Sequence, residues 1–159
     1  MTRAHHLALA AALVVAPALS EPALAVDAGE RVAAAIGKVL NDSAAAYTRG
    51  DLAGFLASYE RSPETTYVSG THVIKGYDAI ARTYADRFRR KPGSSPGTLT
   101  LKLVDVRMLT PTHVLAIGRF KVVAPAGEGA GKGPPATGIF SLLFHKSAAG
   151  WRIAADHTS

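Results

Sequence analysis

The sequence contains no cysteine. This absence excludes disulfide bonds, thiolate metal sites, a cysteine nucleophile and the lipid-modified cysteine of a lipoprotein. Any domain that the chain forms must therefore be held together by its hydrophobic core alone. The chain has 159 residues, of which 48% are hydrophobic. That length and composition predict one globular domain with a single core.

Long apolar runs are also scarce. The run at residues 7–15 is too short to cross a bilayer as a helix. It follows a weakly cationic start at Arg3 and precedes Pro17 and several small residues, which is the three-part pattern of a secretory signal peptide. No later segment is long and apolar enough to span a bilayer, so we expect no transmembrane segment in the mature protein.

The signal pattern leaves two cleavage sites open, Ala18-Leu19-Ser20 and Ala23-Leu24-Ala25. The second site divides the chain into a signal peptide, residues 1–25, and a mature domain, residues 26–159. We therefore expect a periplasmic or secreted protein. The alternative is an N-terminal helix that stays in the protein.

Acidic residues are few: 12 Asp and Glu stand against 18 Lys and Arg, and the formal net charge is +6. A basic protein attracts polyanions. Nucleic acid is not an expected partner in a cell envelope, so anionic lipid, polysaccharide or a small anionic ligand fits this charge better.

Hydrophobic periodicity predicts helices in the first half of the chain and strands in the second. A change of apolar parity after Leu103 predicts a β-bulge that bends the sheet. The nearly continuous apolar run at 139–144 predicts a central strand covered on both faces. Helices are expected at 26–47, at 52–60 and from 77 to the basic residues before Pro92, and strands at 65–69, 72–75, 99–108, 114–123, 139–144 and 151–157. This order predicts an α+β fold with helices packed on one face of a bent antiparallel sheet.

Three local motifs lie at the expected junctions. Residues 49–52 (Arg-Gly-Asp-Leu) separate the first two helices, and residues 76–80 (Gly-Tyr-Asp-Ala-Ile) open the third. The chain ends on Gly-Trp-Arg-Ile at 150–153 and Asp-His-Thr-Ser at 156–159. In this order and spacing the motifs resemble those of the SnoaL-like branch of the nuclear transport factor 2 superfamily, over nearly the whole mature chain.

The resemblance implies a cone-shaped roll, in which three N-terminal helices pack on a strongly bent antiparallel sheet and leave a pocket at the open end. Most members of this superfamily form dimers through the outer face of the sheet, so the resemblance also implies a homodimer. They include ketosteroid isomerases, polyketide cyclases, dehydratases and proteins with no chemistry at all. The fold alone therefore does not determine the function.

This sequence departs from the isomerase pattern at two positions. The resemblance places the isomerases' carboxylate base near Tyr67, between Thr66 and Val68, and their oxyanion tyrosine near Ser43. None of these residues can act as the carboxylate base. We therefore do not expect ketosteroid isomerase activity.

His157 is the candidate catalytic residue. In a regular strand it shares a face with Trp151 and Ile153, so we expect its imidazole to point into the cone as a base, donor or ligand clamp. Asp156 would then point to the opposite face. The alternative role of His157 is structural, with the ring bonded to a backbone carbonyl.

Aromatic side chains with hydroxyl groups are typical of a small-molecule pocket, although each could also be a core residue. Arg107 could bind an anion if it points inward, or it could be solvated or lie in a dimer interface. The ligand-binding residues expected on these grounds are Tyr47, Phe55, Tyr59, Tyr67, Tyr84, Phe88, Arg107, Trp151 and His157.

A basic cluster at the end of the third helix comprises Arg82, Arg87, Arg89, Arg90 and Lys91. It could dock an acidic partner or anionic lipid, but a solvated helix end is the more common explanation of such a cluster. The remaining histidines show no metal-ligand spacing, and no glycine motif suits a phosphate. We expect no metal and no cofactor.

Three functions stay open. The first is a binding module that holds a small, partly apolar ligand in its cone. The second is an enzyme, an isomerase, cyclase, dehydratase or hydrolase, that uses His157 as acid or base. The third is a dimerisation or partner-binding domain with no chemistry.

Overall fold

The computed structural model describes residues 21–88, 96–125 and 134–159. The expected signal peptide lies largely outside these residues and stays a prediction, as do the roles of Arg89, Arg90 and Lys91. The described elements are α1 (Glu21–Arg49), α2 (Leu52–Leu56), β1 (Thr66–Ser69), β2 (His72–Lys75), α3 (Tyr77–Phe88), β3 (Thr98–Thr110), β4 (His113–Val123), β5 (Ala136–Ser147) and β6 (Gly150–Thr158).

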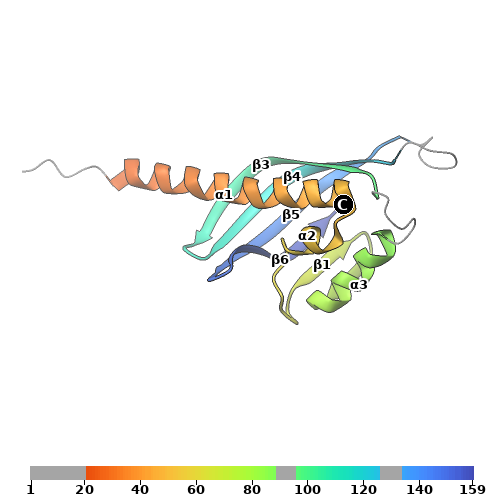
Figure 1. The fold of residues 1–159 in the computed structure, drawn as a ribbon. Helices are drawn as coiled ribbons and strands as arrows, with labels where there is room; N and C mark the ends of the chain where they lie inside the picture. The colour runs from red at the N-terminus through yellow and green to blue at the C-terminus, as the bar shows by residue number, and fades with distance from the viewer. Residues whose placement is uncertain (1–20, 89–95, 126–133) are drawn as a thin grey trace, which may run out of the picture.

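The six strands form one curved, open sheet in the order β2-β1-β6-β5-β4-β3. Neighbouring strands are antiparallel except for β1 and β6, which are parallel. Helix α1 runs along the inner face of the sheet, and α2 and α3 lie at the end where β1 and β6 meet (Figure 1). The predicted α+β cone is therefore confirmed.

The junction between α1 and α2 has a local physical cause. Gly50 adopts a positive φ of 75°, which a side chain would disfavour, and ends α1. Asp51 then caps α2 by accepting a hydrogen bond from the Gly54 backbone amide at 2.8 Å. This turn reverses the chain, so that α2 brings its aromatic residue Phe55 against Tyr47 of α1, with ring centroids 5.5 Å apart.

Of the three register shifts in the described sheet, one lies near the end of β3, between Met108 and Thr110, and the other two shape the sheet around the core. The first of these two lies between Leu103 and Asp105 of β3, where the sequence predicts a bulge, and Val104 is the extra residue, 63% exposed. The second lies where β5 passes from Leu143 to Phe144, opposite an extra residue in β6. Each bulge changes which residues face inward beyond it.

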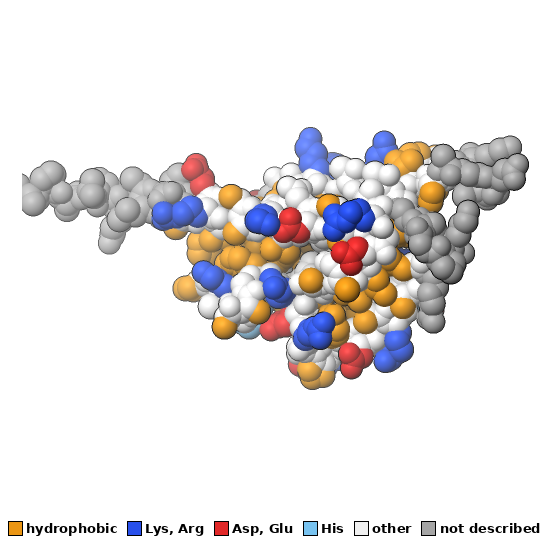
Figure 2. Space-filling view, viewed as in Figure 1, with side chains coloured by type: hydrophobic (Ala, Val, Ile, Leu, Met, Phe, Trp, Pro, Cys, Tyr) orange, Lys and Arg blue, Asp and Glu red, His pale blue; other side chains and the backbone are white. Residues whose placement is uncertain are grey.

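The core fills the space between α1, α2, α3 and the inner face of the sheet. Its fully buried members include Ile36, Ile80, Val114 and Phe144. Towards the N-terminal half of α1 the packing is more open: hydrophobic side chains gather in a hollow below that half of the helix (Figure 2). Partly buried side chains there pack on the core from α1 and β3, among them Val32, Ala35, Val39, Leu103 and Val106.

Strand β5 is central, but the expectation that both of its faces are covered is wrong within this chain. Phe140, Leu142 and Phe144 face inward and are buried. Ile139 on the other face is 47% exposed, because no element of the described chain packs on the outside of the sheet.

In the part of the chain that the structure describes, no helix combines the length and the apolar character needed to cross a membrane.

Candidate functional site

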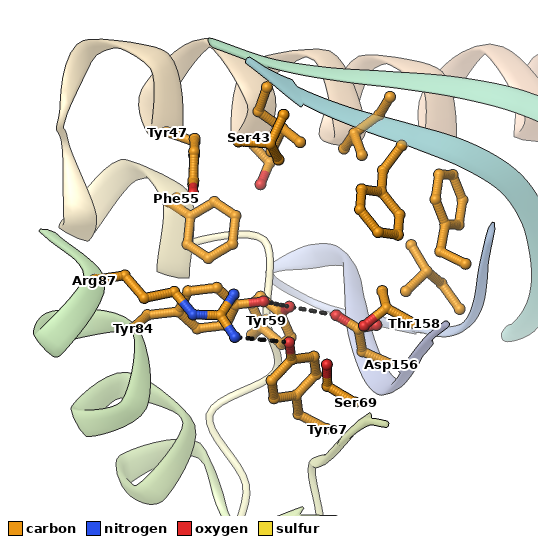
Figure 3. A pocket seen from close by; sticks show the side chains of 16 residues that line it. Ser43, Tyr47, Phe55, Tyr59, Tyr67, Ser69, Tyr84, Arg87, Asp156 and Thr158 are labelled. Carbon is orange, nitrogen blue, oxygen red and sulfur yellow. Dashed lines mark hydrogen bonds between the residues drawn. The ribbon is translucent and has the colours of Figure 1, made fainter. Parts of the chain in front are cut away.

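A cavity of about 160 Å³ lies in the cone between the helices and the inner face of the sheet. Tyrosine hydroxyls, an arginine and a carboxyl group converge on it from α1, from the segment after α2, and from α3, β1 and β6 (Figure 3). Its lining residues are Ser43, Tyr47, Phe55, Tyr59, Tyr67, Ser69, Tyr84, Arg87, Leu99, Leu101, Phe120, Val122, Phe140, Leu142, Asp156 and Thr158.

Asp156 is the buried carboxyl group of this cavity. It is only 6% exposed, and it lies on β6 directly beside Tyr67 of the parallel strand β1. Its Oδ2 accepts a hydrogen bond of 2.5 Å from the Tyr59 hydroxyl, whereas its Oδ1 is buried without a hydrogen-bond partner among the described residues. A buried carboxylate oxygen without a donor is costly, so this atom is the clearest sign of a place where a ligand group can bind.

The expectation that His157 points into the cone is wrong. His157 is exposed and Asp156 is buried, the reverse of the predicted orientation. The cause is the bulge in β6: Ile153 pairs with Phe144 but Ala155 pairs with Leu143, so Ala154 is the extra residue. One extra residue moves every later side chain to the other face.

A hydrogen-bonded chain leads from Asp156 towards α3. The Tyr59 hydroxyl, which donates to Asp156, lies 3.4 Å from the Tyr84 hydroxyl. Burial raises the pKa of both tyrosines well above the ordinary value, and the nearby Asp156 charge acts in the same direction. Both hydroxyls therefore keep their protons at neutral pH and serve as donors.

Burial raises the pKa of the Asp156 carboxyl from its ordinary 3.8 to about 6. The hydrogen bond from Tyr59 and the positive charges of His157 and Arg87 act in the opposite direction but do not outweigh burial. A carboxyl group with a pKa close to neutrality can both take and give a proton under ordinary conditions.

Tyr67 and Arg87 form a second polar group on the same cavity. The Arg87 guanidinium lies over the Tyr84 ring, 4.9 Å from its centroid, and its Nη2 donates to the Tyr67 hydroxyl at 3.3 Å. Burial alone would raise the pKa of Tyr67, but hydrogen bonds with Ser69 and Thr158 together with the Arg87 charge lower it. A tyrosine with a lowered pKa is a stronger hydrogen-bond donor.

The wall opposite these polar groups is apolar. It consists of inward-facing side chains of β3, β4 and β5. Phe140 reaches the cavity because Gly118 lies beneath it on β4: a Cβ atom there would come within 2.2 Å of the Phe140 ring. The sequence alternation predicts the inward direction of Phe120 and Val122 correctly, and the other members of this wall are Leu99, Leu101, Phe140 and Leu142.

The expected ligand-binding residues divide into two groups. Tyr47, Phe55, Tyr59, Tyr67 and Tyr84 line the cavity. The other four do not: Phe88 packs on Tyr47 in the core, Trp151 is buried elsewhere, Arg107 is exposed and paired with Asp105, and His157 is exposed.

Sequence reasoning missed two charged residues of the cavity. It assigned Asp156 to the outer face, because nothing in the sequence Ala154-Ala155 indicates a bulge. It assigned Arg87 to a solvated helix end, and Arg87 is indeed exposed in the last turn of α3, but its guanidinium also lines the cavity. Spacing by three from Tyr84 places both residues on one face of α3. Among the described residues, no group of three or more His, Asp or Glu side chains could hold a metal ion.

The comparisons with known proteins agree with this architecture. The model of the SnoaL-like domain matches residues 36–159, which include the whole of the cavity. The chain belongs to the SnoaL-like domain family. No curated protein is similar enough in sequence to match it.

Several solved structures share this SnoaL-like fold. A protein of unknown function from Shewanella oneidensis, described as NTF-2 like, has a TM-score of 0.69 at 24% identity, over 80% of this chain and 98% of that one. A putative dehydratase of the NTF2-like family from Streptomyces avermitilis has a TM-score of 0.62 at 17% identity, over 82% and 97%. A nuclear transport factor 2-like superfamily protein from Salmonella enterica has a TM-score of 0.59 at 22% identity, over 78% and 87%. At these identities the likeness establishes the fold and leaves the activity to the site.

Proposed function

We propose that this SnoaL-like protein binds a small, largely apolar molecule in its cone, with a polar group of the ligand directed at Asp156. The observation that carries this proposal is the buried Oδ1 atom of Asp156, which has no hydrogen-bond partner in the part of the chain that the structure describes. A folded protein rarely leaves such an atom unpaired, and a donor on a ligand would satisfy it.

The volume of the cavity limits how large the enclosed part of the ligand can be. An apolar cavity of roughly 150 Å³ accommodates benzene, and the volume here is about 160 Å³. The enclosed part of the ligand is therefore the size of one ring or a short acyl chain. Aromatic rings and aliphatic side chains would surround it, and hydroxyl groups and one carboxyl group would fix its orientation.

Filling the cavity should abolish binding. Leu101 lines the cavity from β3, and a Leu101→Trp variant places an indole ring in the space that the ligand would occupy. A small neutral probe, 3-phenylpropionamide, should bind to the wild-type protein and lose at least about tenfold in affinity in this variant. Ligand-observed NMR measures the binding.

The matched control is Val73→Trp, which adds the same ring at a position on β2 that is 71% exposed. This variant should bind the probe like the wild-type protein. Equal binding by the Leu101 variant would show that the probe occupies another place. Native mass spectrometry of the protein from its own host offers an independent measurement, because it detects a small molecule that copurifies.

An enzymatic function is the second candidate, favoured by the environment of Asp156. A carboxyl group with a pKa of about 6 in an apolar cavity is suited to general acid or base catalysis. We propose that Asp156, and not His157, transfers the proton, and that Tyr67 donates a hydrogen bond to the oxygen on which charge develops. The reaction class is then proton abstraction next to a carbonyl, or dehydration.

We further propose that the protein is a homodimer whose subunits meet through the outer face of the sheet. Apolar side chains alternate with the buried ones along the two central strands and stay partly or well exposed in the single chain. They are Leu115, Ile117, Ile139 and Leu143.

A charge on this face should separate the subunits. Leu143→Glu would bury a carboxylate in the proposed interface and should shift the mass in solution from dimer to monomer. Multi-angle light scattering measures that mass, and Val73→Glu on the exposed hairpin is the control that should stay dimeric. A wild-type monomer would refute the proposed dimer.

A further inference from the structure

Arg87 is the one Lys or Arg side chain among the described residues that line the cavity. Some other basic side chains of the described chain have acidic partners, such as Lys38 with Asp42 and Lys75 with Glu64. Arg87 has none within the described residues: its contacts are two tyrosine rings and one tyrosine hydroxyl. No carboxylate of the described residues is therefore in direct contact with this charge, although Asp156 on the same cavity is close enough for Arg87 to lower its pKa.

The position of Arg87 is set by those tyrosines. Its guanidinium stacks over the Tyr84 ring, and one of its nitrogens, Nη2, donates to the Tyr67 hydroxyl (Figure 3). A guanidinium has five N–H donors in a planar fork, and among the described residues a single nitrogen of Arg87 donates a hydrogen bond. The remaining donors match the two oxygens of a carboxylate, and the stacking reduces the rotamer freedom that binding would otherwise remove.

The polar groups of the cavity form one side of it, with tyrosine hydroxyls between Asp156 and Arg87, and the apolar wall lies opposite. Asp156 and Tyr59 lie on the β6 side, Arg87 and Tyr67 on the α3 side, and the rings of Phe55 and Phe140 stand among the apolar walls. An anionic group would be repelled by an ionised Asp156 and attracted by Arg87. The formal net charge of the whole sequence, +6, favours anionic ligands in general.

We propose that the ligand of this cavity is a small organic acid, whose apolar body fills the cone and whose carboxylate pairs with Arg87 and accepts from Tyr67. This inference rests on the proposed binding function and specifies its chemical class. The Asp156 side then faces the body of the ligand, where the carboxyl group can bind a polar substituent.

Two probes of the same shape and different charge test the inference. The acid 3-phenylpropionate carries a carboxylate where 3-phenylpropionamide carries a neutral amide. At pH 7 and constant ionic strength, wild-type protein should bind the acid about tenfold more tightly than the amide, because hydrogen bonds to charged groups are the stronger ones. Titration calorimetry or ligand-observed NMR measures both affinities.

Arg87→Gln should abolish the preference for the acid, so that the variant binds the acid and the amide with equal affinity. Arg87→Lys should retain part of the preference, since it keeps the charge and loses the planar fork. Arg82→Gln is the matched control: it removes the same charge from an exposed position of α3 that does not line the cavity, and it should keep the preference. Circular dichroism checks that all three variants are folded.

The outcomes separate this inference from the proposed binding function. If wild-type protein binds acid and amide equally, or if Arg87→Gln keeps the preference, the acid specificity is refuted while the binding function stands. If Arg82→Gln lowers acid affinity as much as Arg87→Gln does, the preference comes from the general positive field and the assignment to Arg87 is refuted. If neither probe binds at all, both proposals fail.

Discussion

Replacing Asp156 with Asn should raise the free energy of unfolding at pH 8 by about 3 kcal/mol. The carboxyl is 6% exposed, and burial raises its pKa from 3.8 to about 6. At pH 8 the folded protein must keep this group ionised in an apolar cavity, whereas the unfolded chain ionises it in water. A difference of about two pKa units corresponds to roughly 3 kcal/mol. Asn has the same shape, carries no charge, and can still accept from Tyr59.

The effect should depend on pH in a defined way. The folded pKa lies above the unfolded one, so the folded state binds the proton more tightly. Asp156 therefore makes its full contribution to the free energy of unfolding below about pH 4, and this contribution is lost as the pH rises from about 4 to about 6. The advantage of the Asn variant should be largest above pH 6 and disappear near pH 4.

Urea unfolding at pH 4, 6 and 8 measures both claims. Asp42→Asn is the control, because Asp42 is an exposed residue of α1 paired only with Lys38 and its replacement should change stability little at any pH. A variant at Asp156 that is less stable than wild type at pH 8 would contradict the expectation. It would mean that the hydrogen bond from Tyr59 to the charged carboxylate outweighs the cost of burial.

The same substitution should slow proton transfer by about a hundredfold or more, the usual range for losing a general acid or base. The probe is phenylacetone, a small neutral ketone whose α-hydrogens exchange for deuterium in D₂O when a base removes them. Proton NMR follows the loss of their signal with wild-type protein and with Asp156→Asn. The wild-type rate should rise with pH through about 6, as Asp156 becomes ionised.

His157→Gln is the control for this measurement. His157 is the neighbour of Asp156 in β6 but is exposed and does not line the cavity, so its replacement should leave the exchange rate within about twofold. A large loss in the His157 variant with none in the Asp156 variant would return the catalytic role to the histidine. If the wild-type protein does not accelerate the exchange, the enzymatic function is refuted and the binding function stands.

The two results together describe a stability cost at a functional residue. A core position occupied by Asp in place of Asn lowers stability above pH 6 and offers no packing advantage, since the two side chains have the same shape. The carboxylate is useful only where a proton or a ligand has to be handled. Greater stability with lower exchange in one variant would therefore be direct evidence that Asp156 serves the site.

Much of the fold could be predicted because it depends on local patterns. The stripes of α1 and α3, the Gly50-Asp51 junction and the alternation along β4 each follow from side-chain spacing within a few residues. Even the bulge in β3 could be predicted, since large apolar residues stand on both sides of Val104 and show the change of parity.

The candidate site could be predicted only in part. The inward orientation of five aromatic residues of the cavity could be predicted from their helical or strand spacing, because residues at that spacing share the face that points to the core. The two charged residues could not. Ala154 and Ala155 are small and alike, so the bulge of β6 leaves no trace in the hydrophobic pattern and Asp156 was assigned to the wrong face.

By itself, then, the sequence determined the order of helices and strands, the bent sheet and the aromatic character of the interior, because these depend on contacts between near neighbours. Only the tertiary structure decided that Asp156 and not His157 points inward, and that Arg87 of α3 meets Tyr67 of β1. Both outcomes depend on the register between strands and on the packing of distant elements. The spacing of residues in the sequence predicts neither the register nor the packing, since one extra residue in β6 exchanges the two faces of the strand.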